Sequence, residues 1–232
     1  MKRFKLRTDL TIEVGGKTLY RIEATKDIER FGVKAGDLGG YIEKEDNLSG
    51  NAWVSGDALV YDDALVSGNA LVSGNAWVYG NARVFGNAWV YGNAQVHGNA
   101  QVRGNTWVCG NACVYGNAQV HGNAQVRGDA SVNGDAQVRG DAQVYANAQV
   151  RGDEIEKEND LINITSNSGS YNITITPNHI KIGCQYHSKK AWFNFTDNEI
   201  MKMDCEKAVE WWRTWKPILK QICDSFASNK EE

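Results

Sequence analysis

The chain has 232 residues with a formal net charge of −3, and 42% of its residues are hydrophobic. A charge so close to zero provides no general attraction for nucleic acid or for membrane surfaces, which excludes the strongly basic classes of binder. The five cysteines form no disulfide framework, and no apolar run follows the basic start of the chain, so we expect reduced thiols, no signal peptide and a cytoplasmic protein.

Residues 1–47 are expected to form a β-hairpin cap. Two runs in which apolar and polar residues alternate flank Gly15 and Gly16, which is the usual signal for a hairpin. The repeats that follow from Leu48 need a cap, because the end of a solenoid exposes unpaired strand edges and an open bore.

A six-residue motif, Gly-Asn/Asp-Ala-x-Val-x, repeats along the chain from Leu48 to Asp153. Valine stands at residue 54 and at every sixth position as far as Val150. The alternation of Ala and Val predicts a short strand with both side chains on one face, and the Gly-Asn or Gly-Asp pair predicts a sharp corner. With three sides per coil, the eighteen units give six coils of 18 residues, on the order of 29 Å long, whose inward positions are apolar except at Thr106.

A meander of hairpins is the alternative arrangement for such short strands. Two-residue hairpin turns favour the order Asn-Gly, whereas this chain has Gly-Asn. A meander also gives no reason for an inward pair as uniform as Ala and Val, so we prefer the parallel β-helix.

The repeat resembles that of hexapeptide-repeat proteins, in which an aliphatic residue is followed four residues later by a small one, as Val84 is followed by Ala88. Residues 36–43, Gly-Asp-Leu-Gly-Gly-Tyr-Ile-Glu, are similar to the lead-in of transferase-like hexapeptide proteins of phages, prophages and bacteria. The resemblance covers residues 20–153 and implies a left-handed coil. We therefore expect a mainly β protein: a left-handed parallel β-helix of about six 18-residue coils with an N-terminal β cap and a small C-terminal α+β module.

Residues 154–232 are expected to hold a linker and that C-terminal module. The valine repeat stops near residue 153, and a polar stretch rich in Asn and Ser follows. Alternating residues predict strands at 171–176 and 179–184, and a third strand is expected at 191–195.

An amphipathic helix is expected over residues 204–227. Its apolar residues recur at intervals of three and four, and Pro217 is expected to kink it. A tryptophan-rich last helix of this kind resembles the tails of some phage hexapeptide proteins.

Stacking at 18-residue intervals places the outward side chains of the β-helix in columns. On one face the residues that precede valine form an apolar column ending in glutamines: Trp53, Leu71, Trp89, Trp107, Gln125 and Gln143. A contiguous apolar patch usually marks a contact surface. We predict an interaction surface made by the first four of these residues with Tyr91, Trp211, Trp212 and Trp215. It would bury against a second chain, as a dimer or trimer, or against the last helix, and the alternative is a solvated ladder that only stabilises the sheet.

Two further columns carry aromatic and basic residues. They supply the candidate contacts for a ligand or nucleotide: Tyr79, His97, Tyr115, Arg103, His121 and Arg139. Aromatic and basic residues in a row can stack on and pair with a nucleotide. The alternative is an ordinary outward β-surface, and with this net charge a nucleic-acid partner is not expected.

The hexapeptide resemblance also raises the question of an enzyme, because many such proteins are coenzyme A-dependent acyltransferases. Those enzymes typically form trimers, place a histidine base at a subunit junction and extrude a loop from the coils. Here no coil is interrupted between residues 48 and 150, and neither His97 nor His121 has a carboxylate in its own unit to orient it. We expect no catalytic residue and no cofactor. Cys184 and His187 make only half of a zinc site, so no metal is expected either.

The sequence therefore favours a non-catalytic scaffold or binding protein. Because of the resemblance, the functional hypothesis is a phage-encoded protein that acts in the host cytoplasm, either by binding a host protein or by sequestering a host signalling nucleotide against defence. A coenzyme A-dependent acyltransferase of the hexapeptide class is the alternative hypothesis.

Overall fold

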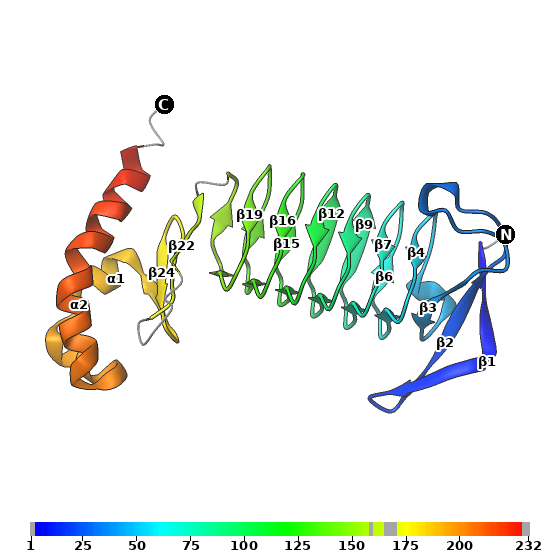
Figure 1. Ribbon diagram of the computed structural model, residues 1–232, viewed down its shortest axis with the longest axis horizontal. Coiled ribbons are helices and arrows are strands. Elements are labelled where there is room, and N and C mark those ends of the chain that lie inside the picture. Colours follow the sequence, from blue (N-terminus) through cyan, green and yellow to red (C-terminus); the bar gives the residue numbers. More distant parts are fainter. Residues whose placement is uncertain (1–2, 158–159, 165–170, 229–232) are drawn as a thin grey trace. The chain divides into compact units, whose positions relative to one another are not determined.

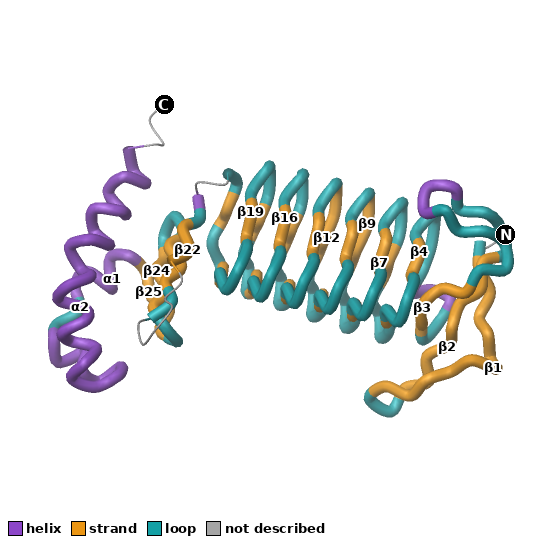
Figure 2. The backbone as a smooth tube through the Cα atoms, in the orientation of Figure 1, coloured by secondary structure: helices purple, strands orange, loops and turns teal. Residues whose placement is uncertain are grey.

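The computed structural model describes residues 3–157, 160–164 and 171–228, with side chains as far as residue 225. The chain divides into two compact units, Met1–Glu158 and Asn159–Glu232. The first unit is a parallel β-solenoid of about six coils with an antiparallel sheet at its N-terminal end, and the second combines an antiparallel sheet with helices (Figure 1, Figure 2). The predicted fold class is thereby confirmed: mainly β, with a capped solenoid and a C-terminal α+β module.

Three walls of short parallel strands enclose the solenoid, and each coil contributes one strand to each wall. The tryptophan wall consists of β4 (Trp53–Val54), β7 (Leu71–Val72), β10 (Trp89–Val90), β13 (Trp107–Val108), β16 (Gln125–Val126) and β19 (Gln143–Val144). The tyrosine wall consists of β5 (Leu59–Val60), β8 (Trp77–Val78), β11 (Gln95–Val96), β14 (Cys113–Val114), β17 (Ser131–Asn133) and β20 (Gln149–Arg151). The arginine wall consists of β6 (Leu65–Val66), β9 (Arg83–Gly86), β12 (Gln101–Gly104), β15 (Gln119–Val120), β18 (Gln137–Val138) and β21 (Glu154–Ile155).

The N-terminal sheet continues the tyrosine wall. The predicted hairpin is formed by β1 (Phe4–Val14) and β2 (Lys17–Ala24), which pair antiparallel. β3 (Leu38–Ile42) pairs antiparallel with β2 and parallel with β5, so a single nine-stranded sheet runs from the hairpin to the last coil. Two short 3-10 helices, Glu29–Phe31 and Glu45–Asn47, complete this region.

Alanine and valine fill the bore as predicted. Their inward side chains are buried, and the backbone amides of each coil donate to carbonyls of the next, as Trp89 N does to Thr106 O at 2.9 Å. Thr106 occupies an alanine position, and its Oγ1 is buried without a hydrogen-bond partner.

The corners require glycine for two reasons. Gly80 has a φ of 70°, and a Cβ there would lie 3.1 Å from the backbone nitrogen of Gly98 in the next coil. The asparagines that follow the glycines form ladders in which each Nδ2 donates to the next Oδ1. One ladder passes through Asn51, Asn69, Asn87, Asn105, Asn123 and Asp141. The two other ladders reach Asp129 and Asp135 in the same way, and a carboxylate suits this place because it accepts but does not donate.

The solenoid extends slightly beyond the predicted end of the repeat. Asp153 takes the place of an inward alanine, and the fully buried Ile155 takes the place of valine, in register with Val138. The spacing from Val150 to Ile155 is five residues, not six, and for this reason the strict period did not reveal the last strand.

The C-terminal unit has a four-stranded antiparallel sheet with two helices. The strands, in spatial order, are β22 (Ile162–Ile164), β23 (Ile173–Ile175), β24 (His179–Ile182) and β25 (Gln185–Ser188). The third strand predicted at residues 191–195 is wrong, because α1 (Lys189–Asn194) covers most of this segment. Ser188 caps that helix, its Oγ accepting a hydrogen bond from Ala191 N at 3.2 Å, which selects the helical backbone.

The last helical element, α2 (Asp197–Ser228), consists of two helices joined at a kink, and the second helix begins after Cys205, close to the predicted start at residue 204. Asp204 and Cys205 have the non-helical dihedral angles that mark this kink, and Pro217 lies inside the second helix. The core of the unit lies between α2 and the sheet and includes Ile180, Trp192, Trp212 and Leu219. No helix of the described residues is long and apolar enough to cross a membrane.

Candidate functional site

The outward residues of the tryptophan wall form one continuous column. Trp53, Leu71, Trp89 and Trp107 are direct neighbours in the parallel register, and Gln125 and Gln143 follow. The rings of Trp89 and Trp107 are stacked with centroids 6.1 Å apart. Trp89 is 37% exposed and Trp107 is 45% exposed, so large apolar area faces outward here.

Trp53 does not belong to this exposed surface. It is only 2% exposed, because the N-terminal sheet covers it. A Cβ on Gly39 in β3 would lie 2.8 Å from Trp53 Cζ2, so the backbone of the cap rests directly on the indole. The exposed part of the column therefore begins at Leu71.

The surroundings of the exposed tryptophans are uncharged. Tyr91 lies beside them, and a side-chain hydrogen bond with Cys109, together with burial, raises the pKa of Tyr91 to about 12. No outward strand position of the first four coils carries a charge on this wall, and the first charged one is Arg127. Arg127 donates to Gln143 at 2.9 Å and lies 5.5 Å from the centre of the Tyr145 ring.

The three tryptophans predicted from the last helix differ in their surroundings. Trp212 is a core residue with 2% exposure, and it contacts Trp192. Trp211 and Trp215 are half-buried and stacked on each other with centroids 5.5 Å apart. Only these two present indole surface to the outside of the unit.

The predicted aromatic column on the tyrosine wall is present. Tyr61, Tyr79, His97 and Tyr115 stack with successive centroid distances of 5.1, 4.7 and 5.1 Å. Each interior ring therefore already has a ring on both faces, and mainly edges are left for a ligand. Their role as nucleotide contacts stays a prediction that this geometry does not favour.

A cysteine–histidine pair that sequence reasoning missed lies in the same wall. Cys113 Sγ is 3.6 Å from His97 Nε2. The 18-residue period could have revealed it, since Cys113 lies one coil beyond Gln95, two residues before the histidine. Desolvation raises the pKa of Cys113 and lowers that of His97, so both groups are neutral near pH 7. A nucleophilic cysteine needs a thiolate, and this pair does not favour one.

On the arginine wall, Arg103 stands beside Phe85 in the register, and Arg139 forms ion pairs with Glu154 at 2.5 Å and Glu156 at 3.5 Å. The pKa of His121 is lowered by burial and by the two flanking arginines. The column exists as predicted, but carboxylates already neutralise one of its cations, and its role in binding a ligand stays a prediction.

Cys184 and His187, the two candidate zinc ligands, have no further ligand beside them among the described residues. Cys184 is exposed in the turn before β25, whereas the His187 ring packs edge-on against Trp192 and Phe195. Within the described residues no three His, Cys, Asp or Glu side chains gather as a metal site.

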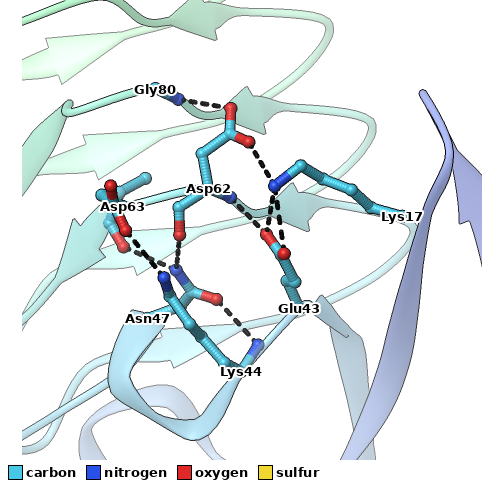
Figure 3. Close-up of polar contacts among 8 residues, drawn as sticks. Lys17, Glu43, Lys44, Asn47, Asp62, Asp63 and Gly80 are labelled. Atoms are coloured by element: carbon cyan, nitrogen blue, oxygen red, sulfur yellow. Dashed lines mark hydrogen bonds and ion pairs between the residues drawn. The ribbon is translucent and has the colours of Figure 1, made fainter.

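A polar cluster joins the N-terminal sheet to the first coils (Figure 3), and it was not found from the sequence. Asp62 replaces a corner glycine at a φ of 59°. Its carboxylate pairs with Lys17 Nζ at 2.7 Å and accepts from Gly80 N at 3.0 Å. Glu43 pairs with the same lysine and accepts from Asp62 N at 2.6 Å. The ion pair lowers the pKa of Asp62 and raises that of Lys17, so these two groups are held charged.

Asn47 anchors this cluster from inside. It is fully buried, and its Oδ1 accepts from Lys44 N at 2.9 Å. Its Nδ2 donates to Asp62 O at 3.0 Å and to Ala64 O at 2.8 Å. The cluster thus satisfies its own groups, which suits a structural junction better than a reactive site.

The comparison with protein families agrees with this architecture. A family model described as the YdcK beta solenoid repeat matches residues 64–80, 76–92 and 108–122. The chain carries a β-solenoid repeat. All three matched segments lie in the coils, so the comparison supports the repeat and makes no statement about the N-terminal sheet or the C-terminal unit. No match was found among curated proteins.

Proposed function

We propose that the protein is a non-catalytic scaffold whose tryptophan wall docks a protein partner, and that a second copy of the chain fits this wall best. The observation that carries the proposal is the stacked and exposed pair Trp89 and Trp107, on a wall without charge in its first four coils.

The exposed apolar area of Trp89 and Trp107 supports a docking role if the residues around them share the interface. The exposed parts of two such rings amount to roughly 200 Å², which corresponds to about 5 kcal/mol of gross hydrophobic stabilisation. Micromolar affinity needs about 8 kcal/mol. Leu71, Tyr91 and the adjoining glutamines would therefore have to share the interface. The wall is already ordered by continuous hydrogen-bond ladders, so little conformational entropy is lost on docking.

Charge and symmetry favour a second copy. Phosphate-bearing partners such as coenzyme A or nucleic acid require cations, which this part of the wall does not provide. Two uncharged walls related by a two-fold axis meet without like-charge repulsion, and the axis can bring the tryptophan pair of one chain against that of the other.

The proposal is tested by comparing two arginine substitutions at equally exposed tryptophans. Trp89→Arg is placed on the tryptophan wall, and Trp77→Arg, at a residue with 38% exposure on the tyrosine wall, is the matched control. We expect the wild type and Trp77→Arg to be oligomeric by light scattering after gel filtration at about 100 µM, above the micromolar range expected for this interface. Trp89→Arg should be monomeric with an unchanged circular dichroism spectrum. A monomeric wild type, or equal loss in both variants, would refute self-docking through this wall.

The acyltransferase alternative has less support, because the coils carry no inserted loop and His97 is surrounded by Tyr79, Tyr115 and Cys113 instead of a carboxylate. Saturable binding of coenzyme A in a calorimetric titration would overturn the non-catalytic proposal. In the phage setting that the sequence resemblance suggests, the same wall would engage a host protein, and Trp89→Arg would abolish that interaction as well.

A further inference from the structure

The tyrosine wall brings a thiol and an imidazole together from adjacent strands. Cys113 lies on β14 and His97 directly follows β11, and these two strands pair in parallel register. Cys113 Sγ lies 3.6 Å from His97 Nε2, and both side chains are half-buried on the outside of the wall. Thiolate sulfur and imidazole nitrogen are both ligand atoms of zinc in proteins.

The separation of these two atoms matches neighbouring ligands on a tetrahedral metal ion. With zinc bonds of roughly 2.3 Å to sulfur and roughly 2.0 Å to nitrogen, ligands at the tetrahedral angle lie about 3.6 Å apart. A linear arrangement with the same bond lengths would hold the two atoms about 4.3 Å apart. The pair can therefore bind a tetrahedral ion without any movement of the backbone.

Both ligands are already held in place. The imidazole is stacked between Tyr79 and Tyr115, with ring centroids 4.7 and 5.1 Å away and interplanar angles of 10° and 8°. The backbone of Cys113 is fixed by the ladder, since its N–H donates to Ala130 O at 2.9 Å. Because little conformational freedom remains to be lost on binding, even a small set of ligands can hold an ion.

The surroundings of the pair are uncharged and supply oxygen. Gln95 and Ser131 lie beside Cys113 in the register, one coil before it and one coil after it. The Gln95 side chain is exposed, and its amide oxygen is a possible ligand. Burial raises the pKa of Cys113 and lowers that of His97, and no charged neighbour contributes to either shift. A cation placed here therefore meets no repulsion from a lysine or arginine of the described residues.

We propose that Cys113 and His97 bind one zinc ion on the outside of the tyrosine wall. Cys113 supplies the sulfur, His97 supplies Nε2, and oxygen atoms of water and of the Gln95 amide fill the remaining positions. The thiol releases its proton to solvent as the zinc–sulfur bond forms. Calcium and magnesium prefer sites made of oxygen alone, so this pair selects against them. The site remains open to solvent, unlike a structural zinc site with four protein ligands.

The first test uses Co²⁺ and Zn²⁺ on the untagged, reduced full-length protein. Co²⁺ substitutes for zinc, and a thiolate bound to it gives a charge-transfer absorption band in the near ultraviolet that nitrogen and oxygen ligands do not give. We expect a saturable band at one cobalt per chain, which disappears when Zn²⁺ is added. A thiol–imidazole hydrogen bond alone would also explain the 3.6 Å separation, but it would give no band.

Substitutions locate the ion. Cys113→Ser should abolish the band, and His97→Gln should weaken cobalt binding at least about tenfold. The matched controls are Cys109→Ser and His121→Gln, which change the same residue types on the two other walls and should bind like the wild type. Circular dichroism checks the fold of each variant. The proposal is refuted if no band appears, if the band survives Cys113→Ser, or if His97→Gln and His121→Gln behave alike.

A second measurement on the wild type does not depend on any variant. Zn²⁺ should slow the alkylation of Cys113 by iodoacetamide, followed by mass spectrometry of its peptide, and should leave the rates at Cys109 and Cys184 unchanged. Equal rates at Cys113 with and without Zn²⁺ would overturn the assignment. The tryptophan wall takes no part in either measurement, so their outcome is independent of the proposed docking.

Discussion

Thr106 breaks the inward alanine–valine pattern in the middle of the solenoid. Each inward position has nearly the same surroundings in every coil, so alanine and valine recur and their burial could be predicted from the period alone. Compared with the alanines of the other coils, Thr106 adds a hydroxyl and a methyl group, and its buried Oγ1 has no hydrogen-bond partner. The cost of burying this group should therefore be visible in the stability of the protein.

Replacing Thr106 by alanine should stabilise the fold. The substitution removes an unsatisfied buried hydroxyl, which should stabilise the fold by about 1–3 kcal/mol. It also removes the packing of one buried methyl group, which should cost about 1 kcal/mol. We expect the free energy of unfolding in urea to rise by about 1 kcal/mol, the difference between these terms. Thr106→Ser keeps the hydroxyl and loses the methyl, so it should lower stability. Equal destabilisation by both variants would contradict this explanation.

The columns of outward residues could also be predicted, but their exposure could not. The period places Trp53, Leu71, Trp89 and Trp107 together, and the structure confirms that order. Whether a column member is covered depends on the N-terminal sheet, whose contact with Trp53 rests on Gly39 in β3. Such a contact joins distant parts of the chain and leaves no mark in a six-residue pattern.

At the scale of elements, one predicted strand proved wrong and one strand was missed, each for a local reason. Residues 191–195 were expected to form a strand, but Ser188 caps a helix there and Trp192 donates to Ile180 O. At β21 the strand was missed because one residue is absent from the repeat. Alternation therefore predicts elements well where the repeat is strict and poorly where a cap or a deletion intervenes.

The joint between the N-terminal sheet and the coils should depend on Asn47. Its replacement by alanine leaves Lys44 N, Asp62 O and Ala64 O without their side-chain partner inside the protein, so we expect a loss of about 3 kcal/mol. Thermal unfolding followed by circular dichroism measures this loss. Asn51→Ala, at the exposed start of an asparagine ladder, is the control and should cost less than about 1 kcal/mol. Equal effects would show that Asn47 is not the anchor described.

At the scale of the whole molecule, the bore and the outer walls obey different periods. The bore repeats every six residues, since all units supply the same inward pair, whereas the wall on which an outward residue lies repeats every 18. A deletion can therefore change which outward residues share a wall without changing the kind of residue that fills the bore.

Deleting residues 93–98 should keep the solenoid but move Trp107 away from Trp89. The deletion joins Gly92 to Asn99, so the six-residue motif continues without interruption, while every later strand moves back to the preceding wall. We expect cooperative unfolding and a β-rich spectrum, together with loss of the oligomer. Both are measured by circular dichroism and light scattering.

Deleting residues 111–128 is the matched control for that experiment. It removes one full coil and leaves Leu71, Trp89 and Trp107 on their wall, so the oligomer should persist. If the six-residue deletion also left the oligomer intact, association would not depend on the tryptophan column.

The glycine corners have a consequence for how such a gene can change. Because the coding units are nearly interchangeable, unequal recombination can add or lose one hexapeptide without harming the hydrophobic interior, yet every downstream face then turns by a third of a revolution. Only gains or losses in multiples of three units preserve a surface that selection has shaped. A lineage that keeps its partner should vary in length by whole turns, whereas one that adds single units acquires new combinations of neighbours on an unchanged frame.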